Sequence, residues 1–466
     1  MGDKRLGRIA AHGTMVAVSY RFSRLDLWVF VYYLMLGWRS LRANVILTTL
    51  VVIAIGIGIG ASMTMLTIFL NVSGDPIPDK SAQLFTPQID NWGPANPVPK
   101  MRDDKLPLEL SYIDAIGLMR AHAAKRQTAI TSTRLAVTPP DPRQLPFTVS
   151  ARATYTDFFS MFEVPFQFGA PWNASEDEGR VPLVVISREL NDRLFAGANS
   201  VGRSLRLGTD VYKVAGVMNH WAPVPRFYDL QGGISASEAQ IYLPFTLAIA
   251  WRMPHGIQCP PGKELGSGPD ALLSSECVWI QLWVELPTPD SVRVYRAFLQ
   301  SYADSQRRDG RFDWPGRIAL RDVRQWLSYN HVLTTEVRAL TGASLAFLLV
   351  CLLNAMGLML AKFMGRAADI GVRRALGATR RAILTQCLIE AGVIGLAGGV
   401  LGLALTGLGL VGLRSVLSEE ILELTHLDLA GVGIALGLAI AATVMAGLYP
   451  TWKACQLQPA WQLKAH

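Results

Sequence analysis

Hydrophobic residues in this chain are concentrated in four long uncharged runs, separated by sequence of ordinary mixed polarity. Each run has about 20 residues or more, which is the length that an α-helix needs to cross a bilayer. The pattern predicts four transmembrane helices, at Val45–Leu70, Leu340–Ala361, Ala391–Leu413 and Leu429–Tyr449, with the third extended by helix back to residue 383. The predicted fold class is therefore membrane α-helical, with a large α+β extracytoplasmic domain (residues 71–339) inserted between helices 1 and 2.

The inserted domain contains two segments in which a strand-like alternation gives way to a helical period and then returns, as in a β-α-β unit. The predicted elements are strand 82–85, helix 112–125 and strand 127–137 in the first unit, and strand 278–286, helix 290–307 and strand 317–320 in the second. Asp290 is expected to cap the second helix. We expect the two units to pair in one α+β subdomain, with the residues between them forming an inserted subdomain.

The inserted subdomain shows its own pattern of short elements. A helix is expected at 156–161, a buried strand at 181–186, a helix capped by Ser187 and ending at Phe195, and a hairpin of strands 202–207 and 212–217. After the second β-α-β unit, residues 322–340 are expected to form one helix that continues into the second transmembrane helix. Its first part, residues 322–339, would act as a stiff stalk.

The net charge of +8 is distributed around the apolar runs in a way that indicates topology. Arginines and lysines cluster before the first run and between the second and third, whereas the segment between the third and fourth carries Glu419, Glu420 and Glu423. Because basic flanks remain in the cytoplasm, residues 1–44, 362–382 and 450–466 are expected inside, and residues 71–339 and 414–428 outside. This arrangement argues for a bilayer as the partner of the basic residues and against a nucleic acid.

The N-terminal region is expected to anchor the chain. The first run starts too late and is too long for a cleavable signal peptide, so it is interpreted as a signal anchor. Before it, the aromatic and aliphatic segment Leu25–Arg39 suits a helix lying in the cytoplasmic interface. The alternative is that this segment extends the first transmembrane helix.

Cysteine positions agree with this topology. Cys259 and Cys277 both lie in the external domain, on either side of a Pro/Gly-rich excursion, and they can form a disulfide in an oxidising compartment. The alternative is two free thiols, because sequence separation says nothing of the geometry. Cys351, Cys387 and Cys455 fall in or beside spanning helices or in the tail, and none is expected to be bridged.

The sequence contains no recognisable motif for catalysis or for cofactor binding. There is no phosphate-binding loop, no histidine or cysteine cluster at metal-ligand spacing and no catalytic pair in the apolar runs. We therefore expect neither an enzyme nor a directly bound cofactor or metal. Glu390 is a functional candidate because it is ionisable beside an apolar run, although one more helical turn would place it at the interface.

Glycines recur in two of the apolar runs at or near the small-xxx-small spacing that allows helices to approach closely. They are Gly56, Gly60, Gly395, Gly399 and Gly402. This spacing predicts close helix packing and allows dimerisation.

The cytoplasmic loop has an ordered pattern that topology alone does not require. Residues 366–381 read as a short amphipathic helix in which Ile370, Val372, Leu376 and Ala378 can pack, with arginines on the other positions. Gly377 is expected to end this helix. A loop that only needed to remain inside would need the charges and not the apolar pattern, so this loop is our candidate interaction site.

The same segment resembles the coupling loop of the MacB/FtsX-like superfamily of ABC transporter permeases, with Asp369 in place of the usual glutamate. The start of the chain (Leu36–Asn44) and its end (Tyr449–Ala454, Pro459, Ala460) are similar to the same family. Within the external domain, the order and spacing of Phe158-Phe159, Val185-Ile186-Ser187, Leu194-Phe195, Val201-Gly202 and Val214–Val217 resemble the MacB-like periplasmic core domain. The Cys259–Cys277 excursion is not part of this resemblance.

The resemblance implies a permease of the bacterial inner membrane that works with a separate ABC ATPase subunit, which would bind ATP and Mg²⁺. A second permease copy or a paralogue would complete the complex, and a periplasmic adaptor and an outer-membrane channel are further expected partners. The implied ATPase-coupling interface consists of Asp369, Ile370, Val372, Arg373, Arg374, Ala375, Leu376, Gly377 and Ala378.

Three functions are compatible with this resemblance. The first is export of an envelope substrate, such as a peptide or an antibiotic-like molecule, by mechanotransmission from the ATPase to the external domains. The second is release of lipoproteins. The third is regulation of a cell-wall hydrolase without transport, as in FtsX-like proteins, whose first external domain is much shorter than residues 71–339.

Overall fold

The computed structural model describes residues 45–93, 106–230, 239–250, 256–262, 265–268, 270–332 and 335–416, and seven isolated positions between 433 and 452. The chain divides into two compact units. The helical unit consists of residues 1–63, 344–407 and 429–466, and the sheet unit of residues 64–343 and 408–428. We describe each unit separately.

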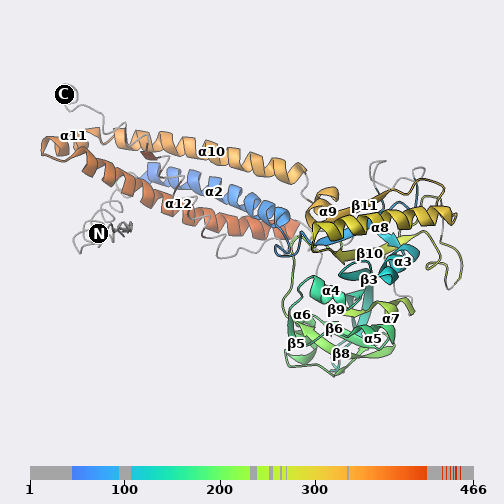
Figure 1. Ribbon diagram of the computed structural model, residues 1–466. Helices are drawn as coiled ribbons and strands as arrows, with labels where there is room; N and C mark the ends of the chain where they lie inside the picture. The colour runs from blue at the N-terminus through green and yellow to red at the C-terminus, as the bar shows by residue number, and fades with distance from the viewer. Residues whose placement is uncertain are drawn as a thin grey trace, which may run out of the picture. The chain divides into compact units, whose positions relative to one another are not determined.

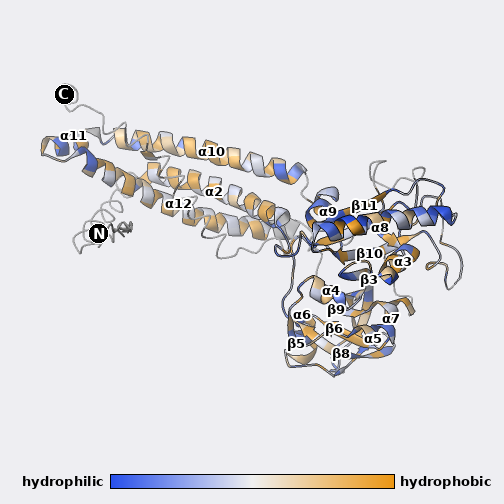
Figure 2. Cartoon of the chain, viewed as in Figure 1, coloured by the Kyte–Doolittle hydropathy of each residue, from blue (hydrophilic) through white to orange (hydrophobic). Residues whose placement is uncertain are grey.

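Three long helices provide most of the described helical unit: α2 (Val45–Ser73), α10 (Thr335–Met364) and α12 (Arg380–Val416). The segments Val45–Asn71, Thr335–Met364 and Arg380–Gly412 are long and apolar enough to cross a membrane, and Figure 2 shows that hydrophobic residues recur along these helices. They correspond to the first three predicted spans. The fourth, Leu429–Tyr449, lies outside the described residues apart from isolated positions, as does the interfacial helix predicted at Leu25–Arg39.

Glycines bring these helices into close contact. A Cβ atom on Gly402 of α12 would lie 2.7 Å from a methyl carbon of Ile59 on α2, and one on Gly398 would lie equally close to Ile55. From the other side, Gly56 of α2 faces Leu401. The close packing predicted for Gly56, Gly60 and Gly402 therefore occurs within this chain, between α2 and α12. Gly398, one turn before Gly402, takes part in the same contact although it was not among the predicted glycines.

The sheet unit is built on one eleven-stranded sheet, in the order β11-β1-β10-β3-β4-β9-β6-β8-β5, with β2 and β7 paired beside this path. The strands are β1 (Leu84–Ile89), β2 (Leu110–Ser111), β3 (Arg126–Thr138), β4 (Phe147–Thr154), β5 (Phe166–Gly169), β6 (Leu183–Ile186), β7 (Ser204–Leu207), β8 (Asp210–Met218), β9 (Ile241–Pro244), β10 (Val278–Glu285) and β11 (Ile318–Asp322). The helices are α3 (Tyr112–Ala121), α4 (Asp157–Met161), α5 (Ala174–Glu178), α6 (Arg188–Phe195), α7 (Phe245–Ala250), α8 (Pro289–Arg308) and α9 (Val323–Tyr329), and Figure 1 shows their arrangement.

The two β-α-β units interleave in this sheet. β1 of the first unit pairs antiparallel with both strands of the second, β10 and β11, and β10 also pairs antiparallel with β3. The helix of the second unit, α8, begins at Pro289, and its cap is Thr288 in a reciprocal capping box with Ser291, not the predicted Asp290. Proline is favoured at this first helical position because it has no N–H to satisfy there.

The residues between the two units extend the sheet on the β3 side. β4 and β9 run parallel, as do β6 and β8, and β9 pairs antiparallel with β6. Ser187 caps α6 as predicted, because its hydroxyl accepts a hydrogen bond from the Leu190 N–H at 3.2 Å. An aromatic cluster that includes Phe158, Phe162 and Trp283 packs against this part of the sheet and is fully buried.

The single helix predicted at residues 322–340 is wrong. Asp322 caps α9 by accepting a hydrogen bond from the Gln325 N–H at 2.7 Å, and α9 ends at Tyr329. His331 then has a φ of +53°, a left-handed conformation that interrupts a right-handed helix, and α10 starts afresh at Thr335. The stalk is therefore two helices, and Trp326 of α9 is buried in the aromatic cluster.

A disulfide joins Cys259 to Cys277 and closes the Pro/Gly-rich excursion. The residue beside it, Glu276, accepts a hydrogen bond from the Arg311 Nε at 2.7 Å. The Arg311 Nη1 also donates to Asp114 of α3 at 2.6 Å, and the Asp114 side chain is fully buried. The disulfide thus closes the excursion on itself, and Arg311 connects Glu276 at its end to Asp114 of α3.

We predict that alanine at two glycines of α12 has opposite effects. Alanine replaces glycine in a helix with a gain of about 1 kcal/mol, but at Gly402 the new methyl group collides with Ile59. Gly402→Ala should therefore reduce the free energy of unfolding by on the order of 1–3 kcal/mol. The thermal unfolding temperature of the detergent-solubilised protein should fall accordingly. Gly407→Ala, where a Cβ meets nothing within 4 Å, is the matched control and should leave that temperature unchanged or raise it. Equal shifts for both variants would contradict the packing.

Candidate functional site

The predicted coupling segment forms a short helix, α11 (Ala367–Ala375), at the end of the bundle where α10 and α12 meet (Figure 1). Leu376 is 84% exposed and Val372 is 59% exposed. Most of the predicted site residues are exposed with them, and Ile370 and Arg374 are half-buried; the exposed ones are Asp369, Val372, Arg373, Ala375, Leu376, Gly377 and Ala378. The apolar side chains expected to pack, Val372 and Leu376, therefore face outward in this chain.

The end of α11 has the geometry that the sequence predicted. Gly377 has a φ of +101°, which glycine adopts without strain, and its N–H donates to the Arg374 carbonyl at 3.1 Å. Two contacts then join the loop to α12. The Arg373 Nη1 donates to Gln386 Oε1 at 3.1 Å, and the Thr379 hydroxyl accepts from the Ala382 N–H at 3.3 Å. The loop thus has a defined shape while its apolar side chains remain exposed.

A buried ion pair lies at the base of this loop. Glu390 of α12 accepts from Lys362 of α10 at 2.8 Å, and the two side chains are 4% and 0% exposed. The Lys362 Nζ also donates to the Thr48 hydroxyl of α2 at 3.0 Å, and Arg366 approaches the same Glu390 oxygen at 3.5 Å. We call Thr48, Lys362, Arg366 and Glu390 the Glu390 cluster.

Glu390 is buried within the helical unit, and its position relative to a membrane interface stays a prediction. Because α12 begins at Arg380, Glu390 is ten residues inside the helix, about 15 Å from its first residue. Moving a charge of this size out of water costs several kcal/mol unless a partner compensates it. Lys362 supplies the compensating charge, and it was not identified from the sequence because it comes from another helix.

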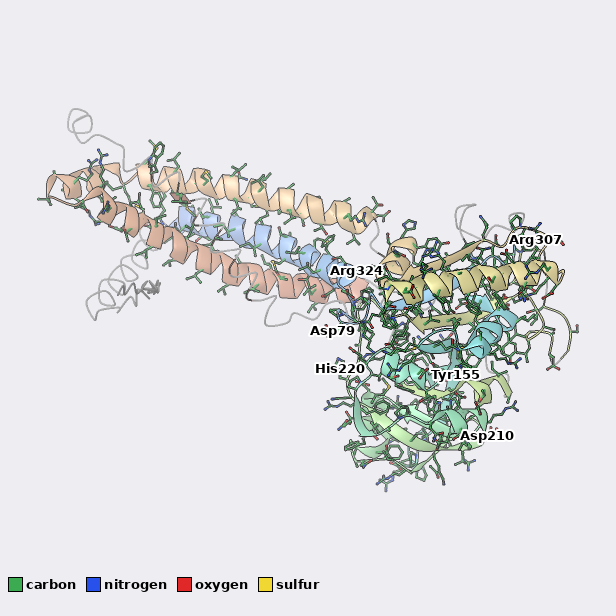
Figure 3. All side chains as sticks on the ribbon, in the orientation of Figure 1. Asp79, Tyr155, Asp210, His220, Arg307 and Arg324 are labelled. Atoms are coloured by element: carbon green, nitrogen blue, oxygen red, sulfur yellow. A yellow bond between two sulfur atoms is a disulfide. The ribbon has the colours of Figure 1, made fainter. Side chains whose placement is uncertain are left out.

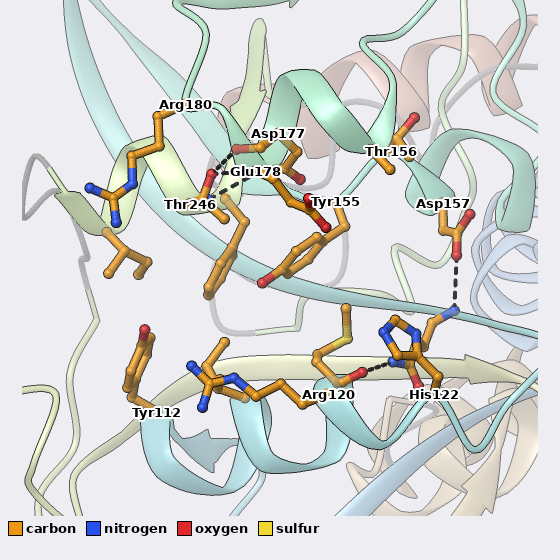
Figure 4. A pocket seen from close by; sticks show the side chains of 16 residues that line it. Tyr112, Arg120, His122, Tyr155, Thr156, Asp157, Asp177, Glu178, Arg180 and Thr246 are labelled. Carbon is orange, nitrogen blue, oxygen red and sulfur yellow. Dashed lines mark hydrogen bonds between the residues drawn. The ribbon is translucent and has the colours of Figure 1, made fainter.

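A cavity of about 490 Å³ lies within the sheet unit, between α3 on one side and α5 and α7 on the other (Figure 4). Tyr155, which is labelled in Figure 3, forms part of the wall of this cavity. Its other walls include Tyr112, Arg120 and Phe245. Sequence analysis did not find this cavity, since its residues come from four separate segments and share no motif.

One acid of the cavity, Asp177, has an altered titration. Its side chain is buried, and burial raises its pKa from 3.8 to about 6, against hydrogen bonds from Thr246 that lower it. The Thr246 hydroxyl donates to Asp177 Oδ1 at 2.8 Å. Burial likewise raises the pKa of the Tyr155 hydroxyl well above its usual value. The Tyr155 hydroxyl therefore stays neutral at physiological pH, whereas Asp177 becomes charged as the pH rises through about 6.

Among the residues described, no group of histidine, cysteine, aspartate and glutamate is placed to hold a metal ion.

Comparisons with known proteins match two parts of the chain. Residues 48–295 match the model of the MacB-like periplasmic core domain, and residues 341–459 match that of the FtsX-like permease C-terminal domain. The macrolide export ATP-binding/permease protein MacB of Syntrophobacter fumaroxidans is 25% identical over 345 residues, which cover 67% of this chain and 46% of that protein. The Escherichia coli (strain K12) MacB is 24% identical, covering 80% of this chain and 52% of that protein.

Shorter relatives also match. The ABC transporter permease YvrN of Bacillus subtilis is 25% identical over 312 residues, covering 66% of this chain and 68% of that protein. The chain spans about half the length of the MacB relatives. Among solved structures, the periplasmic region of MacB from Actinobacillus actinomycetemcomitans aligns with 12% identity and a TM-score of 0.35, covering 56% of this chain and 96% of that one.

We predict that Asp177 makes the stability of the protein depend on pH. Because its pKa is higher in the folded chain (about 6) than its ordinary value of 3.8, the folded state binds the proton more tightly. The resulting stabilisation is complete below about pH 4 and is lost as the pH rises through 6, by up to about 3 kcal/mol. Unfolding of the solubilised protein, followed by tryptophan fluorescence from pH 4.5 to 8, should show this loss in the wild type and a smaller one in Asp177→Asn. Parallel pH profiles would contradict it.

Proposed function

The chain belongs to the family of permeases that combine a MacB-like periplasmic core domain with an FtsX-like permease domain, and on this basis we propose that it is the permease subunit of an ABC transporter. In this proposal an ATPase on a separate chain binds ATP and Mg²⁺, and the permease converts its cycle into movements of the sheet unit. These movements drive the export of an envelope substrate, a peptide or an antibiotic-like molecule.

The observation that carries the proposal is the exposed apolar surface of the loop. Leu376 is 84% exposed, and Val372, one turn before it, is 59% exposed. Burying these two apolar side chains against a partner would be favourable. Arg373, Arg380 and Arg381 surround these side chains with positive charge. A groove with an apolar floor and an acidic rim on the ATPase subunit would complement this surface, because it would bury the apolar side chains and pair the arginines.

The connection to the sheet unit follows the chain. α10 is one unbroken helix from Thr335 to Met364, so it contributes residues to both units. In the proposed mechanism, ATP binding draws together the loops of two permease subunits, either copies of this chain or a copy and a paralogue. α10 then passes the displacement to the residues before it, and the conformational equilibrium of the paired subunits is biased by nucleotide.

The remaining assignments follow from the same proposal. The helices would lie in the bacterial inner membrane, with both termini and α11 in the cytoplasm and the sheet unit outside. A periplasmic adaptor and an outer-membrane channel would complete the export route. Relatives whose names state macrolide export support the choice of an antibiotic-like substrate.

We predict that Leu376→Asp breaks the interface with the ATPase. The detergent-solubilised, affinity-tagged chain should recover an ATP-hydrolysing subunit from its own cells, and the buried aspartate should lower that recovery at least about tenfold, since losing an anchor residue costs about 2 kcal/mol or more. ATPase activity in the eluate is the measurement. Leu145→Asp is the matched control, because Leu145 is also 84% exposed but lies in the loop between β3 and β4.

The two variants separate the outcomes. If Leu145→Asp lowers recovery as much as Leu376→Asp does, the effect is a general one and the loop is not the interface. If the wild type recovers no ATPase activity under mild conditions, the transporter proposal fails.

A further inference from the structure

We propose that Glu390 is a positioning residue for the 366–381 loop, which it holds in a fixed orientation on α2, α10 and α12 through its ion pair with Lys362. This inference concerns the geometry of the chain itself. Its consequence for ATPase coupling rests on the proposed function.

The contacts of Glu390 place it where the loop begins. Lys362 lies in the last turn of α10, and Arg366 occupies the N-cap position of α11. One Glu390 oxygen lies 2.8 Å from the Lys362 Nζ and 3.5 Å from the Arg366 Nη1. A single carboxylate on α12 is therefore in contact with the helix that enters the loop and with the N-cap residue of α11.

Thr48 adds the third helix. Its hydroxyl accepts from the Lys362 Nζ at 3.0 Å, and it lies in the first turn of α2. The Glu390 cluster thus connects all three described spanning helices at their α11 end, whereas the glycine contacts of Gly398 and Gly402 join α2 and α12 farther along the helices. Because the glycine contacts already hold α2 and α12 together, the Glu390 cluster is not needed for that packing.

The energetics support a positioning role over a stabilising one. Replacing a buried ion pair by apolar side chains of similar volume is often neutral or stabilising, and ionisable groups in spanning helices are costly. Apolar residues would satisfy the packing of this bundle without that cost. What the charges add is direction, since a hydrogen bond depends on the angle between its groups and apolar contacts do not.

The other contacts of the loop are not sufficient to hold α11 in a fixed orientation. The Arg373–Gln386 and Thr379–Ala382 hydrogen bonds lie at exposed positions, where water competes for the donors and acceptors. The Glu390 cluster is shielded from water at Lys362 and Glu390. Without it, α11 would keep its helical form but lose its fixed angle to α10 and α12.

The experiment removes both charges of the pair, so that no unpaired ion is left to unfold the bundle. In a background lacking Cys351, Cys387 and Cys455, a nitroxide spin label is attached at Val372→Cys on α11, and separately at Val294→Cys on α8; these side chains are 59% and 53% exposed. Electron paramagnetic resonance spectra of the full-length, solubilised protein are then compared with and without Lys362→Met/Glu390→Leu.

We expect the double variant to unfold at the wild-type temperature and to leave the label at residue 294 unchanged, while the label at residue 372 becomes more mobile. ATP hydrolysis by the co-purified ATPase should fall between about twofold and thirtyfold, the range measured when coupling networks are altered, with recovery of that ATPase reduced less than by Leu376→Asp.

Two results would overturn the proposal. A wild-type spectrum at residue 372 in the double variant shows that the ion pair does not position the loop. Increased mobility of both labels shows that the cluster only maintains the fold. If the wild type recovers no ATPase, the proposed function fails, but the spectra still decide the role of Glu390.

Discussion

The antiparallel pairing of β1 with β11 is the constraint on which the sheet unit depends. β1 is the first strand after α2 and β11 is the last before α9 and α10, and five residue pairs from Phe85↔Asp322 to Ile89↔Ile318 hold them in register. The chain must therefore return to its starting edge after some 230 residues, a long-range contact that costs loop-closure entropy. β10 and β3 continue the sheet from this seam, and the rest of the unit extends from β3.

In the helical unit, the constraint is the selection of one arrangement of three apolar helices. Its surfaces are apolar, so hydrophobic burial against lipid does not select one arrangement of helices, and close approach at small residues must do so. Gly56, Gly398 and Gly402 provide that approach between α2 and α12. The Glu390 cluster then adds polar contacts at one end, beside the only described loop that joins two spanning helices. Packing and orientation are therefore assigned to separate residues.

Sequence patterns predicted what a single segment determines by itself. Apolar length located α2, α10 and α12, a serine located the start of α6, and a glycine located the end of α11, because each signal acts within a few residues. The burial of Glu390, the break after Tyr329 and the cavity around Asp177 depend on residues distant in sequence. Strands β4, β5 and β9 were missed for the same reason, since their short runs become strands through their neighbours. The fourth span stays a prediction.

The break between α9 and α10 has a mechanical meaning. A continuous helix would carry both displacement and rotation, but the described residues Asn330, His331 and Val332 lie outside α9 and α10. Trp326, buried in the aromatic cluster, clamps α9 to the sheet. The left-handed conformation of His331 lies between the two helices. Rotation of α10 about its own axis is therefore not imposed on α9 through a continuous helix.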